Sequence, residues 1–550
     1  MSRPGGIWGS RALCMHAVCT STYPEIASLS HLSVCRILGS PQRLGARMKL
    51  PHRVSALLVA AAHVWARTAS AIDYPDNTPP KNVDVWCGKA YRATDVPFTG
   101  LVDKGWLYPP PHSDVPRLAF TCRARLKPFV KGTDARKASI VVDARISHDV
   151  GTPFPHARPV ESIYVTVSVS SLQLVNTQMR LGDQVEIAVD LDKLPPRTEP
   201  YSLTCHAAAS DSGPQFATAS SELYWLPPSP YNGSIVQLDT STGELVVSGN
   251  IAPGLPGANR EPFFPIGYYT GWGNYLESNF GILSEIKKAG FTLVHPIPGG
   301  GSANEAWGQG GLQRFGQFLD AALEAGVWVM YDMRHTYSSS ADLKMQIRAF
   351  RDHPALLLWY TADEPDGHND PTNSTYLAYK SINALDGYHP VSFTPNCQNY
   401  FFEQYASGAD IVVPDIYPVG NNVTFSTVYN TPCNRTYGCC GCDNCLGTLH
   451  DLATRIEEMK EFTRWMGTHK IFWGVSQAFG ASEFWSRVPT HDEMVDMSRS
   501  AIAAGAKGML YWASPTTDEI WKATSEIAKG MNSQTAGKWV VQEREVRTEL

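Results

Sequence analysis

Three acids, Asp363, Glu364 and Asp366, directly follow an apolar run and are the residues in this sequence most able to do chemistry. The run, residues 356–362, is short, continuous and apolar, which predicts a buried strand. Pro365 and the Asp-Gly pair behind it stop this strand and turn the chain. A carboxylate at such a point can act as a general acid or base, or it can belong to an ordinary solvated turn.

The elements around these acids predict an α/β fold, a (β/α)8 TIM barrel over residues 261–533. Strand-like runs alternate there with amphipathic stretches, and Gly290, Gly326 and Gly505 fall at predicted helix ends. No Gly-x-Gly-x-x-Gly follows the first strand, which disfavours a doubly wound sheet. In a barrel, the carboxyl ends of the strands carry the active site. The predicted strands are 263–269, 292–298, 327–335, 356–364, 391–396, 411–417, 471–477 and 508–514.

Polar and aromatic side chains stand where nearly all of these strands end. Carboxylates accept hydrogen bonds from hydroxyls, and flat rings pack on apolar faces, so such a set suits a carbohydrate. One such residue alone is more often a satisfied core group, and only the recurrence indicates a site. The residues predicted to bind substrate are Tyr269, Trp272, His295, Tyr331, His335, Asp363, Asn396, Tyr417, Gln477 and Trp512.

The segment Trp-Tyr-Thr-Ala-Asp-Glu-Pro at 359–365 resembles the Trp-x-x-x-Asn-Glu-Pro element of clan A glycoside hydrolases. The opening Phe-Phe-Pro-Ile-Gly-Tyr-Tyr at 263–269 and the Asp-x-Tyr-Pro step at 415–418 are also similar to that family. The resemblance covers residues 234–533. It implies that Glu364 is the general acid/base, that Asp363 stands where the family has the Asn that holds the sugar 2-hydroxyl, and that Tyr417 lies beside the second catalytic group.

The sequence departs from the family at strand seven, which ends in Gln477 where the family has a nucleophilic Glu. A neutral amide cannot attack an anomeric carbon, so we expect the second carboxylate elsewhere. Asp415, at the end of strand six, is the first candidate, with Asp332 and Glu483 as alternatives. A separation of about 5 Å between the two carboxyls would indicate retention, and roughly 6.5–9.5 Å would indicate inversion.

An all-β sandwich is predicted before the barrel, over residues 72–230, because short β-rich runs recur there between turn residues. Its role is either carbohydrate binding or packing against the barrel. Cys122 and Cys205 lie on two of these runs and form a plausible pair between the sheets. A linking hairpin follows at 231–260, and a Cys-rich loop at 419–449 is either a lid or decoration.

The N-terminal region predicts a signal peptide over residues 48–71, with a basic start, a short apolar core and a small-residue cleavage site. Residues 1–47 form an upstream extension, which is either an over-extended gene model or a mitochondrial transit peptide. The polar tail 534–550 excludes a lipid-anchor signal. No later stretch of about 18 apolar residues is present, so no membrane span is expected.

Sequons and cysteines favour secretion. Five of the nine Cys beyond the signal peptide fall within residues 433–445, and no His lies there at zinc-ligand spacing, so disulfides are expected rather than a metal. No cofactor is expected. The predicted glycosylation sites are Asn232, Asn373, Asn422 and Asn434.

The net charge of −6 without a basic run argues against nucleic acid as a partner. The expected partner is a carbohydrate substrate, as the strand-end residues and the resemblance indicate. No Gly-x-Ser-x-Gly elbow supports a serine hydrolase. The sequence therefore predicts a secreted glycoside hydrolase or transglycosylase that uses carboxylate acid/base catalysis. The alternative, motivated by Gln477, is a non-catalytic glycan-binding or cell-wall protein on a degenerate barrel.

Overall fold

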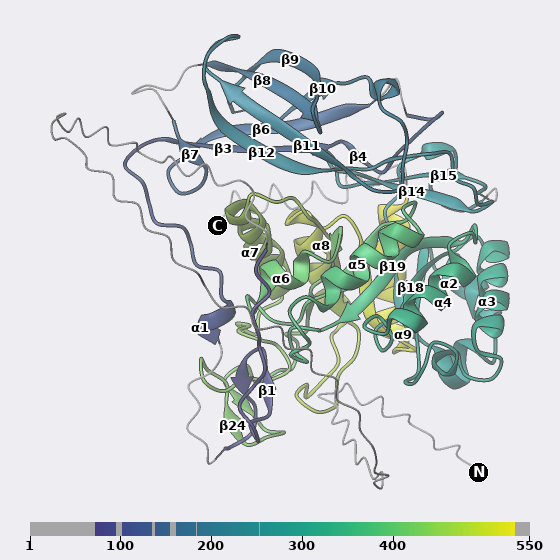
Figure 1. Cartoon of the computed structure of the whole chain (residues 1–550). Helices are drawn as coiled ribbons and strands as arrows, with labels where there is room; N and C mark the ends of the chain where they lie inside the picture. The colour runs from purple at the N-terminus through teal and green to yellow at the C-terminus, as the bar shows by residue number, and fades with distance from the viewer. Residues whose placement is uncertain are drawn as a thin grey trace, which may run out of the picture. The chain divides into compact units, whose positions relative to one another are not determined.

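The computed structural model describes residues 72–94, 102–134, 138–154, 161–182, 184–251 and 254–533, which lie in one compact unit (Figure 1). The predicted extension 1–47, signal peptide 48–71 and tail 534–550 lie outside these residues. An all-β part comes first along the chain and a mixed α/β part follows. Among the described helices, none combines the length and the apolar character needed to cross a membrane.

Two four-stranded antiparallel sheets face each other in the all-β part, in the orders β10-β6-β3-β7 and β12-β11-β8-β9. Burial alternates strictly along β8, as expected for a strand with one face on a core. The predicted disulfide between Cys122 of β3 and Cys205 of β11 links the two sheets. The strands are β3 (Arg117–Ala124), β6 (Ser139–Ser147), β7 (Thr152–Pro153), β8 (Ser162–Val169), β9 (Leu172–Arg180), β10 (Gln184–Ala188), β11 (Tyr201–Ala208) and β12 (Gln215–Leu223).

A three-stranded sheet, β15-β14-β4, joins the two parts. The predicted hairpin forms its larger portion, β14 (Ser234–Asp239) and β15 (Leu245–Gly249), and β4 (Leu126–Lys127) comes from the all-β part. Lys127 donates to the buried carboxylate of Asp410, which precedes the sixth predicted strand of the α/β part. Asp410 also accepts from Tyr379 at 2.8 Å and from the backbone of Val391 at 3.0 Å.

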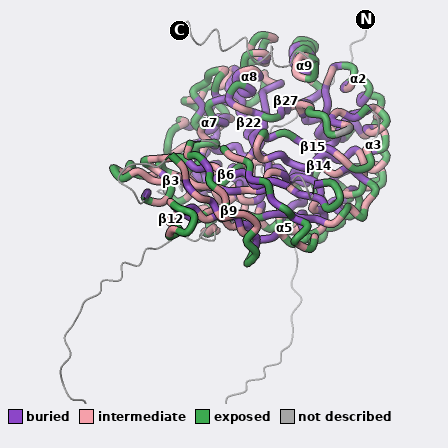
Figure 2. The backbone as a smooth tube through the Cα atoms, turned by 90° about the horizontal axis from the view of Figure 1, so that it is seen from above, coloured by how far each residue is buried: buried purple, intermediate pink, exposed green. Residues whose placement is uncertain are grey.

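A ten-stranded parallel sheet forms the α/β part, in the order β22-β26-β27-β16-β17-β18-β19-β20-β21-β25. Its strands are buried, and helices with exposed outer sides surround them (Figure 2). The strands are β16 (Ile266–Gly271), β17 (Leu293–Ile297), β18 (Trp328–Asp332), β19 (Leu356–Asp363), β20 (Val391–Thr394), β21 (Ile411–Val412), β22 (Asp415–Ile416), β25 (Ile471–Phe472), β26 (Gly474–Gln477) and β27 (Met509–Ser514).

Each of the eight strands predicted from the sequence is present, but the sixth and seventh are each divided in two. Pro414 separates β21 from β22, and a proline has no N–H to give to a neighbouring strand. The two divided strands remain paired along their length, because β21 pairs with β25 and β22 pairs with β26.

Helices alternate with these strands and carry the expected end signals. Thr490 and Glu493 form a capping box at the start of α8. Gly290, Gly326 and Gly505 all have positive φ, as predicted for residues that end helices. The helices are α2 (Ile282–Lys288), α3 (Gly311–Ala325), α4 (Ser340–Phe350), α5 (Ser374–Leu385), α6 (Phe402–Ala406), α7 (Asp451–Met466), α8 (His491–Ala503) and α9 (Asp518–Met531).

Residues 72–94, which we call the N-terminal strap, were expected to begin the sandwich, but the first sandwich strand is β3. The strap instead contacts loops of the α/β part. Cys87 forms a disulfide with Cys397, beyond the end of β20. Lys89 pairs with Asp443 in the Cys-rich loop, with 2.7 Å between Nζ and Oδ1. The strap is therefore part of the surroundings of the strand ends.

The ion pair at the joint leads to a stability prediction. Lys127→Met leaves the buried Asp410 without its nearest cation, and this should lower the free energy of unfolding by about 3 kcal/mol. Lys131→Met, at an exposed position, should change it by less than about 0.5 kcal/mol. Urea denaturation measures both variants, and equal effects would show that the buried pair contributes nothing specific.

Candidate active site

Two predicted catalytic carboxyls meet at the carboxyl ends of the strands. Glu364 directly follows β19, and Asp415 begins β22. Their side chains are hydrogen-bonded to each other. The amide nitrogen Nδ2 of Asn396, two residues beyond β20, donates to Oε1 of Glu364 at 2.8 Å and to Oδ1 of Asp415 at 3.4 Å. Three predicted site residues on three neighbouring segments thus form one hydrogen-bonded cluster.

Asp415 is the buried member of this pair, with 6% of its surface exposed. Burial, reinforced by the charges of Asp363 and Asp366, raises the pKa of Asp415 to about 8, although its hydrogen bonds with Glu364 and Asn396 oppose the shift. The two carboxyls therefore hold a proton between them at neutral pH.

Glu364 is half-buried and is the member of the pair that reaches the surface. Its backbone has a φ of 49°, in the left-handed region that residues other than glycine seldom adopt. The backbone N–H of Glu364 donates to the carbonyl of Thr394 at 2.8 Å, which holds this conformation. Such local strain, of order 1–3 kcal/mol, is characteristic of functional sites.

Every polar group of Asn396 is engaged. Its backbone N–H donates to Oδ1 of Asp366 at 3.1 Å, and its carbonyl accepts from Nη1 of Arg455 at 3.1 Å. Its side-chain oxygen accepts from the indole N–H of Trp86 at 2.9 Å. The direction in which Asn396 presents its amide to the carboxyl pair is therefore fixed from several sides.

Asp366 stabilises the turn behind Glu364. Its carboxylate accepts backbone N–H groups from Gly367 at 2.9 Å, Asn396 at 3.1 Å and Cys397 at 2.9 Å. Burial raises the pKa of Asp366 to about 7 in spite of these hydrogen bonds. Asp366 thus ties the loop after β19 to the loop after β20.

A second polar cluster lies beside the pair and is centred on Arg334. Its guanidinium donates to Asp363 at 2.6 Å and to Asp332 at 2.7 Å. Asp332 also bonds Nε2 of His295 at 2.8 Å, and Tyr360 donates to Asp363. Burial lowers the pKa of His295, although Asp332 opposes this effect. Asp332 is fully engaged in this cluster.

Three aromatic rings surround the Arg334 guanidinium. Its central carbon lies 5.3 Å from the ring centroid of Trp512, 5.6 Å from that of Tyr360 and 5.7 Å from that of Tyr269. Tyr269 is buried and bonds Thr394 at 3.2 Å, whereas Trp512 is half-buried. Among these three rings, Trp512 is therefore the one placed to meet a ligand.

Tyr331 and Trp272 do not join these clusters. Tyr331 bonds Gln346 of α4 at 2.9 Å and accepts from Trp307 at 2.9 Å. Trp272 donates to the carbonyl of Trp307 at 2.8 Å and packs against Phe318. Tyr331 follows the two-residue period of β18, which turns it to the helices when its neighbour Asp332 faces inward.

Gln477 is buried and satisfied by backbone groups. Its Oε1 accepts from the N–H of Val419 at 2.8 Å, and its Nε2 donates to the carbonyls of Val419 at 3.0 Å and Phe479 at 3.1 Å. The residue at the end of strand seven therefore holds the first residue of the Cys-rich loop.

Three further predicted residues differ in exposure. Burial and the neighbouring charge of Asp415 raise the pKa of Tyr417 well above its usual value, so Tyr417 lies beside the carboxyl pair. Glu483, on the loop after β26, and His335, on the loop after β18, are exposed. All four predicted sequon asparagines are also exposed: Asn232, Asn373, Asn422 and Asn434.

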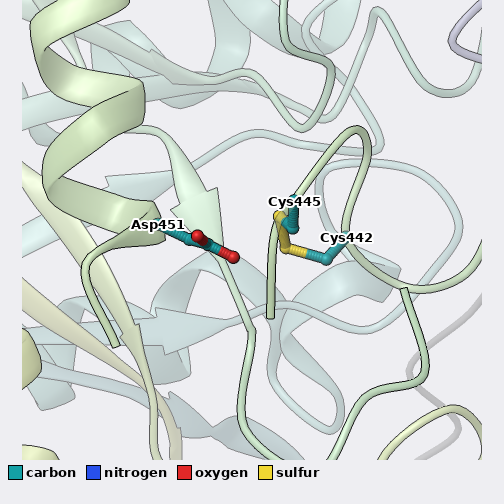
Figure 3. Close-up of side chains that lie close together, drawn as sticks. All are labelled: Cys442, Cys445 and Asp451. Carbon is teal, nitrogen blue, oxygen red and sulfur yellow. A yellow bond between two sulfur atoms is a disulfide. The ribbon is translucent and has the colours of Figure 1, made fainter. Parts of the chain in front are cut away.

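The Cys-rich loop brings Cys442, Cys445 and Asp451 together, with ligand atoms within 4.8 Å of one another (Figure 3). The two cysteines are bonded to each other as a disulfide. The Oδ2 atom of Asp451 accepts the backbone N–H groups of residues 446, 447 and 448. The two sulfur atoms are used in the disulfide and the Asp451 carboxylate is used by backbone N–H groups, so these three residues do not fit a metal ion.

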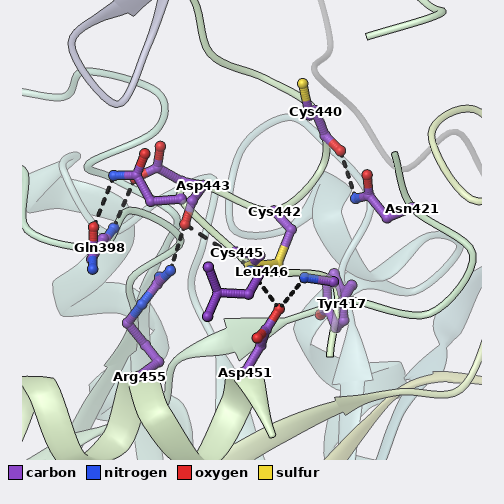
Figure 4. The surroundings of a disulfide bond; sticks show 12 residues. Gln398, Tyr417, Asn421, Cys440, Cys442, Asp443, Cys445, Leu446, Asp451 and Arg455 are labelled. Carbon is purple, nitrogen blue, oxygen red and sulfur yellow. Dashed lines mark hydrogen bonds between the residues drawn. A yellow bond between two sulfur atoms is a disulfide. The ribbon is translucent and has the colours of Figure 1, made fainter. Parts of the chain in front are cut away.

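The same loop is fastened to the residues around the pair (Figure 4). Asp443 accepts the backbone N–H of Gln398 at 2.9 Å, and its carbonyl accepts from Arg455 at 2.5 Å. Arg455 also bonds the carbonyl of Asn396. A movement of the loop would therefore be transmitted to Asn396.

A hollow of about 740 Å³ lies at the other end of the sheet, before β16 and β17. Phe264, Phe291 and Lys287 are among its lining residues. None of Glu364, Asn396 and Asp415 lines this hollow, so it is separate from the carboxyl pair.

The sequence did not indicate the roles of Trp86 and Asp366, and Arg334 is absent from the residues predicted to bind substrate although it stands at a predicted strand end. Arg334 had a signal, because it stands at the carboxyl end of the predicted strand 327–335. Trp86 precedes Cys87, whose partner Cys397 follows Asn396, so knowledge of that disulfide would have placed Trp86 at the site.

The raised pKa of Asp415 gives a stability prediction. An unfolded Asp has a pKa near 3.9, so the folded state binds this proton more tightly and stability falls as the pH rises from about 4 to about 8. Asp415→Asn removes the titrating group. Its stability gain over the wild type should grow with pH to the order of a few kcal/mol at pH 8. Thermal unfolding between pH 5 and 8 measures the gain, and a constant difference would contradict the raised pKa.

No protein-family model matches this chain, and no curated protein matches its sequence. Solved structures match it at low similarity. A β-glucuronidase from Ruminococcus gnavus is 10% identical over 76% of this chain and 68% of its own, with a TM-score of 0.33. A glycosyl hydrolase family 2 member from Bacteroides cellulosilyticus is 12% identical over 72% of this chain and 43% of its own, with a TM-score of 0.32.

A candidate beta-galactosidase from Bacteroides fragilis is 10% identical over 72% of this chain, with a TM-score of 0.34. The chain spans about half the length of the two Bacteroides proteins, 54% and 43%. With TM-scores below 0.4, none of these likenesses carries information on what this chain does.

Proposed function

We propose that this chain is a secreted glycoside hydrolase whose acid/base is Glu364. The observation that carries the proposal is the hydrogen-bonded pair of Glu364 and Asp415, which holds a proton at neutral pH and includes one member that reaches the surface. A proton donor for a leaving glycosidic oxygen needs a carboxyl with a raised pKa near an ionisable partner.

The proposal includes a closed (β/α)8 barrel. If β21 and β22 count as one strand, and β25 and β26 as another, the sheet has eight strands. The combined sixth strand pairs with β20 on one side and with the combined seventh on the other. The seventh then pairs with β27, which pairs with β16. These pairings support a ring with no free edge.

In this proposal, Asp415 stores the proton and Glu364 delivers it to the substrate. Asp415 is buried and holds the proton, and its hydrogen bond to Glu364 supplies the path by which the proton reaches the surface. Glu364 then protonates the leaving oxygen of the substrate. Asp415, left as a carboxylate once its proton has passed to Glu364, attacks the anomeric carbon as the bond to the leaving oxygen breaks. Water, activated by the ionised Glu364, then hydrolyses the glycosyl-enzyme bond, so the configuration at the anomeric carbon is retained.

Asp363 and Trp512 complete the substrate contacts in this proposal. Asp363 is about one-fifth exposed, and Arg334 and Tyr360 orient its carboxylate, so it can accept a hydrogen bond from a sugar hydroxyl next to Glu364. The half-buried ring of Trp512 offers a face for stacking on a sugar. Asp332 accepts a hydrogen bond from Arg334, and His295 bonds Asp332 in turn.

Secretion is supported by the exposure of all four sequon asparagines and by the disulfides, which persist in oxidising compartments. A non-catalytic glycan-binding protein is the second candidate. The observation that favours it is Gln477, whose amide is fully used by backbone groups at the position where a nucleophile was expected.

Replacement of the acid/base tests the proposal directly. Glu364→Gln keeps the size of the side chain but cannot donate its proton, so hydrolysis should fall by about 10²–10⁴-fold. Glu244→Gln, in the exposed turn between β14 and β15, is the matched control and should keep full activity. The assay is a digest of plant, fungal and bacterial polysaccharides, with NMR of the released anomer.

Equal turnover by Glu364→Gln and Glu244→Gln would reject Glu364 as the acid/base. Glycan binding by the wild type without release of any sugar over the whole panel would select the binding protein instead. A retained anomeric configuration in the product is the expected stereochemical result.

The pH profile gives a further test. The carboxyl pair keeps its proton below a pKa of about 8 and loses it above, so kcat/KM should fall about tenfold per unit on the alkaline side. The measurement is kcat/KM from pH 5 to 10 on the substrate found in the panel. An alkaline limb below pH 6 would show that the pair ionises like ordinary exposed acids.

A further inference from the structure

Trp86 of the N-terminal strap contacts Asn396, which lies 310 residues away along the chain. Its indole N–H donates to the side-chain oxygen of Asn396 at 2.9 Å. The ring is 8% exposed and contacts His368 edge-on, with centroids 4.9 Å apart. The indole thus lies within the site and is held there by packing.

The chemistry of the indole decides which way the Asn396 amide points. An indole N–H is only a donor, so the amide must turn its oxygen to Trp86 and its NH2 group to the two carboxyls. In the opposite orientation, the amide oxygen would face Glu364 and Asp415, and the amide NH2 would face the indole N–H. Both contacts would then be unfavourable.

A disulfide and a glycine keep Trp86 in place. The next residue, Cys87, is bonded to Cys397, which follows Asn396 directly. A Cβ at Gly367 would come within 2.4 Å of the indole ring, so the turn behind Glu364 leaves the room that the ring occupies. The turn at residues 364–367 and the strap therefore pack against each other at the indole ring.

We propose that Trp86 is a positioning residue for the acid pair, so that the N-terminal strap completes the active site of the barrel. The inference rests on the proposed function for its kinetic consequence, but not for its effect on the carboxyls themselves. Without the indole N–H, the amide of Asn396 is free to turn, and its hydrogen bonds to Glu364 and Asp415 weaken.

The charged and titratable groups around the pair come from several elements and all remain in place when Trp86 is changed. Loss of the amide hydrogen bond should stabilise the protonated form of the pair, since that bond favours the ionised form of Asp415. These groups are Asp363 and Asp366 beside β19, Tyr417 after β22, Tyr269 on β16, Arg334 after β18, His368 against the indole, and Lys89, Asp443 and Arg455 behind Asn396.

The test compares Trp86→Phe with Trp328→Phe in the full chain. Both changes remove a buried indole N–H and keep a ring, but Trp328 donates to the carbonyl of Pro256 at 2.8 Å, away from the pair. Trp86→Phe should lower kcat about tenfold with little change in KM, and Trp328→Phe should change kcat less than twofold.

Carboxyl titration by ¹³C NMR gives a readout that needs no turnover. The upper pKa of the pair should rise by about half a unit or more in Trp86→Phe and stay unchanged in Trp328→Phe. If Trp86→Phe does not fold, Gly367→Ala displaces the ring and leaves every other side chain, and the same shift is expected.

Equal titration of the pair in Trp86→Phe and Trp328→Phe would overturn the inference. A shifted titration in a protein that hydrolyses no glycan would leave the positioning role intact and reject the proposed function. The two ideas can therefore fail separately.

Discussion

The interaction on which the site depends is the double hydrogen bond from the Asn396 amide to Glu364 and Asp415. Two carboxyls in contact repel each other when both are ionised, and burial makes that repulsion stronger. A proton between them removes the repulsion, and the amide stabilises the charge that remains. One neutral donor thereby helps two acids to stand at one point.

The amide is held by parts of the chain that are distant in sequence. Trp86 comes from the strap, Asp366 from the turn after β19, and Arg455 from α7. Arg455 and Lys89 also meet Asp443, so the Cys-rich loop shares the same supports. Several loops therefore hold the amide that bonds the acid pair. This arrangement suits a site that must keep two carboxyls within hydrogen-bond reach.

Periodicity and strand order predicted where Glu364, Asp415 and Asn396 meet, because the ends of neighbouring parallel strands share one edge of a sheet. The prediction that Tyr331 binds substrate used only its position near a strand end. It did not consider the side of the strand to which the residue points, and the side chain contacts α4 instead. Trp86 was beyond prediction for a different reason. The nine cysteines after residue 71 do not specify their pairing in the sequence, and the Cys87–Cys397 bond is one of the contacts that hold the strap at the site.

Gln477, at the end of the seventh strand, anchors the Cys-rich loop. Its amide both donates to and accepts from the backbone of Val419, which a carboxylate could not do, so the residue at the end of strand seven starts the Cys-rich loop in a fixed direction. That loop carries Asp443 to Lys89 and Arg455, and these two bring the strap and α7 to Asn396. In this chain the end of the seventh strand anchors the loop that supports the acid pair.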